Sequence, residues 1–167
     1  MNNRIFLKIL LFTIFLASLC NLICACSKKQ YNDTVDCEYI TDALQSKALA
    51  GEEYSTYAYE DISFILDEIE GFDSYSVIYS SSSDDIGEIG VFHAVSADKS
   101  ADLLDDIAEY LSELKKEKIS FVKNYLPEEQ KKLDGATVKC FGNYVVFTVL
   151  DASQSKAVFA QIEQILE

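Results

Sequence analysis

The stretch "ATVKCFGNYVVFTVL", residues 136–150, carries the strongest secondary-structure signal in this chain. Gly142 and Asn143 separate two runs, 136–141 and 144–150, that are rich in β-branched and aromatic residues. A two-residue connection with glycine is typical of a tight β-hairpin, because such turns need backbone angles that glycine adopts easily. The stretch therefore predicts two antiparallel strands joined by a two-residue turn.

A second hairpin is predicted on either side of "SSSDD", residues 81–85. Before this turn, "SYSVIYSS" alternates, with Tyr75, Val77 and Tyr79 on one side of a strand. After it, "IGEIGVFHAV" (86–95) places Glu88 on one side together with every second residue, and His93 on the other. Alternation with a period of two residues is the pattern of a β-strand.

Helical patterns flank and separate the hairpins. They cover about residues 38–50 and 60–70, a long stretch capped by Asp98 and ended near Pro127, a short helix that begins at Pro127, and a last helix capped by Asp151. The main elements follow the order helix, helix, two strands, long helix, two strands, helix. This order predicts an α+β fold, with an antiparallel four-stranded sheet made of two hairpins and helices packed on one face.

The N-terminus predicts export. Arg4 and Lys8 precede an uncharged run from residue 9 to residue 23, which is shorter than the roughly 20 apolar residues of a membrane-spanning helix. Ile23, Cys24 and Ala25 resemble a bacterial lipobox before Cys26. The resemblance implies a signal peptide at 1–25, a lipidated Cys26, a tether at 26–37 and a single domain at 38–167. The alternative is an uncleaved membrane anchor.

Such processing places the chain on the outer face of the cytoplasmic membrane, held by the lipid. Removal of residues 1–25 leaves 14 − 2 = 12 basic and 28 acidic residues, a formal charge of −16. This charge disfavours nucleic acid as a partner, since nucleic-acid binding needs a basic surface. Solubility is the simplest explanation of the acidity.

Two cysteines, Cys37 and Cys140, remain in the predicted domain. They form an even pair in an exported protein, and a disulfide between them closes a loop of about 100 residues. The alternative is that Cys140 is a buried free thiol on its strand.

The stretches "IGEIGVF", "KNYLPEEQKKLDGATV" and "GNYVVFTVLDASQSKAVFAQI" resemble a bacterial lipoprotein family called domain of unknown function 4358, found in Gram-positive anaerobes. The resemblance covers about residues 38–166. It implies a single lipid-anchored domain and supplies no catalytic residue.

Two groups of residues are candidates for contact with a ligand or partner. Tyr54, Tyr57 and Tyr59 lie among acidic residues in "EEYSTYAYED", where they either stack on a ligand or pack over the core. Asp84, Asp85 and Glu88 lie at the turn of the first hairpin, where they form either a solvated tip or a calcium site.

The sequence predicts neither a cofactor nor a metal site. His93 is the only histidine, and a structural role is favoured for it because no nucleophile motif accompanies it. We therefore expect a non-catalytic binding or interaction module, with an unknown protein or cell-wall partner. The alternatives are a cell-wall or carbohydrate-acting enzyme with paired carboxylates and a solute-capture accessory of a transporter.

Overall fold

The computed structural model describes residues 29–66 and 69–167. Residues Tyr31–Glu167 form one compact unit. Its elements, in chain order, are α2 (Cys37–Lys47), β1 (Tyr54–Thr56), α3 (Tyr59–Leu66), β2 (Phe72–Ser80), β3 (Glu88–Ala94), α4 (Ala97–Tyr125), the 3-10 turn η1 (Pro127–Glu129), α5 (Gln130–Gly135), β4 (Thr137–Phe141), β5 (Tyr144–Val149) and α6 (Ala152–Leu166).

The strands form one antiparallel sheet in the order β1-β2-β3-β5-β4. Both predicted hairpins are confirmed, β2–β3 and β4–β5, and the sheet joins them by pairing β3 with β5. The prediction of four strands was wrong, because a fifth strand, β1, pairs with β2 at the edge. Only three residues long, β1 is too short to show an alternating pattern.

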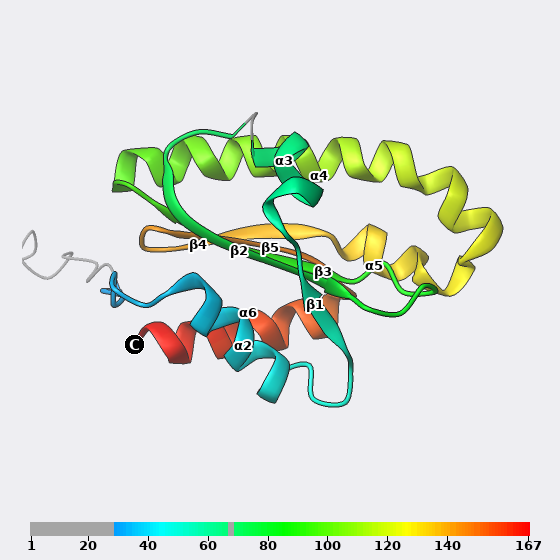
Figure 1. Ribbon diagram of the computed structural model, residues 1–167, viewed down its shortest axis with the longest axis horizontal. Helices are drawn as coiled ribbons and strands as arrows, with labels where there is room; N and C mark the ends of the chain where they lie inside the picture. The colour runs from blue at the N-terminus through cyan, green and yellow to red at the C-terminus, as the bar shows by residue number, and fades with distance from the viewer. Residues whose placement is uncertain (1–28, 67–68) are drawn as a thin grey trace, which may run out of the picture. The chain divides into compact units, whose positions relative to one another are not determined.

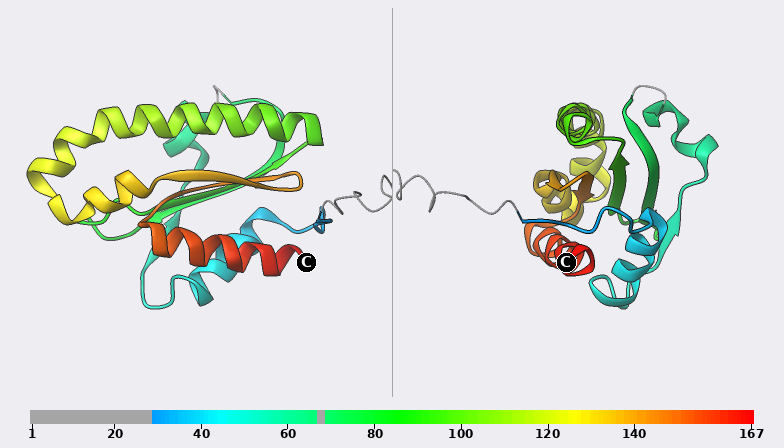
Figure 2. Two further views of the ribbon diagram at one scale, coloured as in Figure 1. Left: turned by 180° about the vertical axis from the view of Figure 1, so that it is seen from behind. Right: turned by 90° about the vertical axis from the view of Figure 1, so that its left-hand side faces the viewer.

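Helices cover both faces of the sheet, so the prediction of one covered face was also wrong. Figures 1 and 2 show α4 on one side of the sheet and α2 with α6 on the other. The reason lies in β5, whose six residues are all buried. Tyr144 and Val146 pack in the core with α2 and α6, whereas Val145 and Phe147 pack in the core with α4. A strand that is apolar on both sides needs a layer on each face.

The helix ends follow local capping chemistry. Asp151 caps α6 as predicted, and it accepts hydrogen bonds from the backbone of Ser153 and Gln154. The cap of α4 is Ser96 rather than Asp98, because the Ser96 hydroxyl accepts the backbone N–H of Lys99. Pro127 occupies the first turn of η1, where its missing N–H leaves no bond unmade.

The predicted signal peptide and Cys26 lie outside the described residues. Among the helices that the structure describes, none is long and apolar enough to cross a membrane. Residues 31–36, part of the predicted tether, pack on the domain. The Tyr31 ring contacts Phe141 edge-on, and the Asn32 N–H donates to the carbonyl of Leu166 at 2.7 Å.

Candidate functional site

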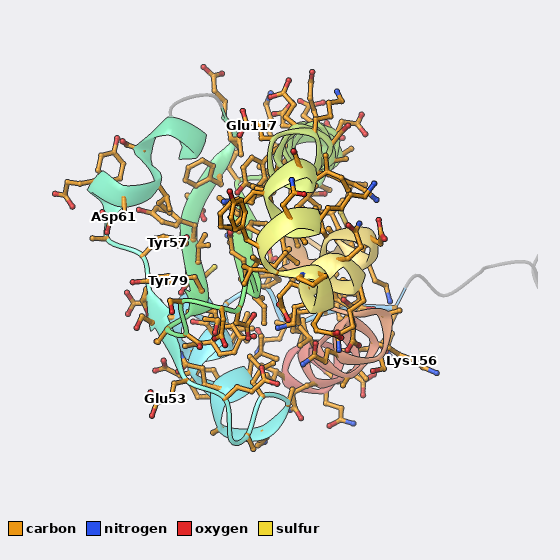
Figure 3. All side chains as sticks on the ribbon, turned by 90° about the vertical axis from the view of Figure 1, so that its right-hand side faces the viewer. Glu53, Tyr57, Asp61, Tyr79, Glu117 and Lys156 are labelled. Carbon is orange, nitrogen blue, oxygen red and sulfur yellow. The ribbon has the colours of Figure 1, made fainter. Side chains whose placement is uncertain are left out.

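One residue of the tyrosine segment, Tyr57, and one of the acidic turn, Glu88, lie close together on the face of the sheet that α4 covers, although they are 31 residues apart in sequence. Tyr79 on β2 is the cross-strand partner of Glu88 on β3. The ring of Tyr57 stacks on that of Tyr79, with 4.2 Å between the centroids. From α4, the Tyr110 hydroxyl donates to Glu88 Oε1 at 3.4 Å. We call these four residues, Tyr57, Tyr79, Glu88 and Tyr110, the Glu88 cluster; Figure 3 shows two of them, Tyr57 and Tyr79, next to each other.

The alternation of β3 explains why Glu88 points inward. Phe92 and Ala94, four and six residues farther along the strand, belong to the same core as α4, whereas Ile89 and Val91 pack toward α2 and α6. Gly90 lies between Glu88 and Phe92 on the same side of β3. It lets the Phe147 ring approach the strand, since a Cβ there would lie 2.1 Å from Phe147 Cε1. The strand thus holds a carboxyl group at the end of an apolar row.

Burial governs the ionisation of the Glu88 cluster. Glu88 is only 8% exposed, and this burial raises the pKa of its carboxyl to about 7, against the smaller opposing effects of the Tyr110 hydrogen bond and Lys118. Burial also raises the pKa of Tyr57 to about 12 and the pKa of Tyr110 further above its ordinary value. Near neutral pH Tyr57 and Tyr110 are therefore neutral, while Glu88 is divided between its acid and its carboxylate.

No cation among the described residues forms an ion pair with Glu88. The ion pairs of the described part of the chain involve other carboxylates, and Glu88 accepts its hydrogen bond from the neutral Tyr110 hydroxyl. A buried carboxyl without a cationic partner is costly to ionise. Groups with such perturbed pKa values are concentrated at functional sites.

Asp85 has a different role from Glu88. Lys132, 6% exposed, places its ammonium 2.5 Å from Asp85 Oδ1 and 3.0 Å from Glu129 Oε2. Asp85 also accepts the Gly87 N–H, and Glu129 accepts the Ile86 N–H. This Lys132 network fixes the β2–β3 turn to η1 and α5. Burial opposes ionisation of Asp85, but the bonds from Lys132 and Gly87 outweigh it and lower the pKa of Asp85.

The remaining predicted contact residues are dispersed. Tyr54 is buried in β1, and its hydroxyl donates to Glu52. Tyr59 is 53% exposed at the start of α3, and Asp84 is exposed and accepts a hydrogen bond from the Ser82 hydroxyl. Asp84, Asp85 and Glu88 therefore have three separate sets of partners. Among the described residues, no three His, Cys, Asp or Glu side chains are grouped to hold a metal ion.

The structure does not bring Cys37 and Cys140 together, and both are free thiols. Cys37 is buried in the core with α2 and α6, where its sulfur lies 3.3 Å from the Ser74 hydroxyl. Cys140 packs against the core with α4, and its thiol donates to the Ser100 carbonyl. The two side chains belong to the cores on opposite faces of the sheet, so the structure has two free thiols in place of a Cys37–Cys140 disulfide.

His93 joins the N-terminal segment to the sheet. Its Nδ1 lies 2.7 Å from Asp73 Oδ1 and its Nε2 lies 3.1 Å from Asp33 Oδ1. Asp33 also accepts a hydrogen bond from Asn143. Burial lowers the pKa of His93, but its hydrogen bonds to the two carboxylates outweigh burial and raise it. These contacts support the structural role that the sequence favours.

A family model described as Domain of unknown function (DUF4358) matches residues 67–150, half of the chain. The chain belongs to the DUF4358 family. The matched region extends from β2 to β5 and includes three of the four residues of the Glu88 cluster, whereas α2, β1, α3 and α6 lie outside it. No curated protein and no solved structure matches the chain. Membership in DUF4358 therefore brings no activity with it.

The sequence does not single out two parts of the site. Tyr110 is one of several half-buried residues on α4, and Lys132 lies in the charged stretch "PEEQKKL" beside the exposed Lys131. The sequence indicates that they are buried only through their position on the helix relative to other apolar residues. Tyr110 lies three residues after Ile107 on the buried side of α4, and Lys132 precedes the buried Leu133.

Proposed function

We propose that this DUF4358 protein is a non-catalytic binding module on the outer face of the cytoplasmic membrane, anchored by lipid at Cys26. The ligand site is the Glu88 cluster, and the ligand carries a positively charged amine. The observation that carries the proposal is a buried carboxyl, with a pKa raised to about 7, among three tyrosines. Among the described residues no cation forms an ion pair with it, and Lys118 acts on it only from a distance.

An ammonium group fits this combination of side chains. A carboxylate attracts the charge directly, and the faces of tyrosine rings attract cations through their electron-rich centres. A bound cation also removes the cost of ionising Glu88, because an opposite charge within about 4–6 Å favours the carboxylate. The acidic surface of the processed chain supports this choice, since it raises the local concentration of cations.

The ligand site is tested by NMR titration of the full chain in detergent with tetramethylammonium chloride. The neutral control is tert-butanol, a compact molecule with similar methyl groups. We expect shifts in the signals of Tyr57, Tyr79 and Glu88 with the cation alone, and at least a tenfold weaker response in Glu88→Gln. Glu117→Gln, an exposed position on α4, is the matched control and keeps the response. Equal shifts with tert-butanol, or an unchanged response in Glu88→Gln, would contradict the proposed site.

The anchor is tested by the intact mass of the protein extracted from membranes. We expect a chain that begins at Cys26 and carries the mass of a diacylglycerol group. In Cys26→Ala the added mass and the membrane association disappear, because two acyl chains together hold a protein on a bilayer. An unlipidated wild-type chain that begins at Met1 would contradict the anchor.

A cell-wall or carbohydrate-acting enzyme is the second candidate, and the raised pKa of Glu88 specifically favours it. A protonated carboxyl near neutral pH is what a general acid needs for cleavage of a glycosidic bond. Release of reducing ends from purified cell walls, lost in Glu88→Gln and retained in Glu117→Gln, would establish catalysis in place of simple binding.

A further inference from the structure

The strand β4 forms the edge of the sheet opposite to β1. Its register with β5 pairs Phe141 with Tyr144 across a two-residue turn, in which Gly142 has a φ of +64°. In such a hairpin the residues that flank the turn exchange backbone hydrogen bonds, and so does every second pair beyond them. The N–H and C=O groups of Val138 and Cys140 therefore point away from β5, along the open edge.

A hollow lies on each side of this edge. The first, about 420 Å³, lies between β4 and α6 and is lined by Thr137, Lys139, Lys156, Phe159 and Ala160, among others. It belongs to the face of the sheet that α2 and α6 cover.

The second hollow, about 280 Å³, lies between β4, α4 and α5. Its lining includes Leu111, Leu133 and Val138, with Lys115 also contributing. It opens on the opposite face of the sheet. This arrangement suits the addition of a strand to the edge. Successive side chains of a strand point to opposite faces, so those of an added strand would enter the two hollows in alternation.

We infer that β4 accepts an extended peptide segment of a partner protein as a sixth strand, with acidic side chains toward α6 and apolar side chains toward α4. This inference goes beyond the proposed function and does not depend on it. Lys156 projects from α6 on the side of the domain opposite to Tyr57 and Tyr79 (Figure 3).

The charges of the first hollow favour acidic residues in the peptide. The ammonium of Lys139 lies 4.8 Å from the centre of the Phe141 ring and 5.8 Å from that of Phe159. Lys139 and Lys156 line this hollow, in a protein whose formal charge is −14. One carboxylate, Glu163, lines it as well, and its Oε1 accepts a hydrogen bond from the Tyr31 hydroxyl at 3.2 Å, so the two lysines leave the hollow with an excess of positive charge. The second hollow is mainly apolar, and its Lys115 already forms an ion pair with Asp134 at 2.8 Å.

A second copy of the chain fits the edge less well than such a peptide. Lys139 is the central residue of β4, so antiparallel pairing of two β4 strands brings two lysines to the same face. Like charges on facing strands are destabilising, and lysine on an edge strand discourages self-association.

The test uses fluorescence anisotropy with the full chain in detergent micelles. The probe is fluorescein-labelled Glu-Val-Glu-Val-Glu-Val-Glu with a blocked C-terminus. We expect saturable binding, weakened at least tenfold by the double substitution Lys139→Glu and Lys156→Glu. The matched control is Lys47→Glu with Lys131→Glu, which changes the net charge equally at exposed positions away from the hollows. Ala160→Trp, which fills the first hollow from the exposed side of α6, should weaken binding as well.

Two further peptides separate strand addition from simple charge attraction. In one, Lys replaces every Glu; in the other, the backbone nitrogens of the valines are methylated and cannot pair with the edge. We expect both peptides to bind at least tenfold more weakly than the probe. Equal binding of the methylated peptide, equal loss in the two double variants, or self-association of the chain with no peptide binding would overturn the inference.

Discussion

We expect Glu88→Gln to gain stability relative to the wild type as the pH rises. The difference between their free energies of unfolding should change by about 3 kcal/mol, in favour of the variant, between pH 4.5 and pH 8. The pKa of Glu88 is about 7 in the folded chain, against 4.5 as its ordinary value. The folded state therefore binds more protons than the unfolded state between these two values, and each unit of the difference is worth about 1.4 kcal/mol. As the pH rises, Glu88 ionises while it is still buried, and the free energy of unfolding of the wild type falls progressively.

Other carboxylates act in the opposite direction, so the comparison must be made with a variant. Hydrogen bonds lower the pKa values of Asp134 and Asp151, and such groups add stability as the pH rises. Glutamine keeps an oxygen that accepts the Tyr110 hydrogen bond but carries no proton to lose. Urea denaturation across this pH range gives the difference between the two curves. Glu117→Gln should run parallel to the wild type, and a parallel curve for Glu88→Gln would refute the burial argument.

Lys132→Met is expected to lower the free energy of unfolding by about 3 kcal/mol at pH 7, because removing one partner of a buried ion pair leaves the other charge unpaired. The ammonium of Lys132 contacts both Asp85 and Glu129, and methionine fills a similar volume without the charge. The loss should shrink as the pH falls, because Asp85 without Lys132 keeps the burial that favours its protonated form but loses the cation that opposes it.

Chemical denaturation of Lys132→Met and Lys131→Met gives the comparison for this prediction. Lys131 is the exposed neighbour on the same helix, so its substitution removes an equal charge without opening a buried pair. Surface substitutions of this kind change stability by about 0.5 kcal/mol or less. Equal effects at both positions would show that Lys132 holds no buried network.

The hairpins and the main helices were predictable because their signals are local. Alternation, a Gly-Asn turn and an aspartate cap are each decided within a few residues. The edge strand β1 has no such signal, since it is stabilised by pairing with residues more than 20 positions away, such as Tyr54 with Ser80. The second helical layer was predictable in principle from β5, whose successive apolar residues are typical of a strand buried on both faces.

The site depended on register, which the sequence specifies poorly. Tyr57 and Glu88 were both candidates, but their proximity follows from β1 pairing with β2 and β2 pairing with β3. The same pairing separates Glu88 from Asp85, because Glu88 faces the core on β3 while Asp85 remains in the turn with Lys132. Asp84, Asp85 and Glu88 therefore lie in three different environments. Their spacing in the sequence predicts one shared site, because spacing alone does not show which way each side chain points.

The most direct measurement is the pKa of the Glu88 carboxyl, followed by NMR of the carboxyl carbon in ¹³C-glutamate-labelled protein and assigned with Glu88→Gln. The account predicts a value of about 7 in the free protein. It also predicts a lower value with saturating tetramethylammonium chloride, and no such change with sodium chloride at equal ionic strength. A value near 4.5 in the free protein would mean that Glu88 is solvated, and it would contradict both the buried site and the ligand proposed for it.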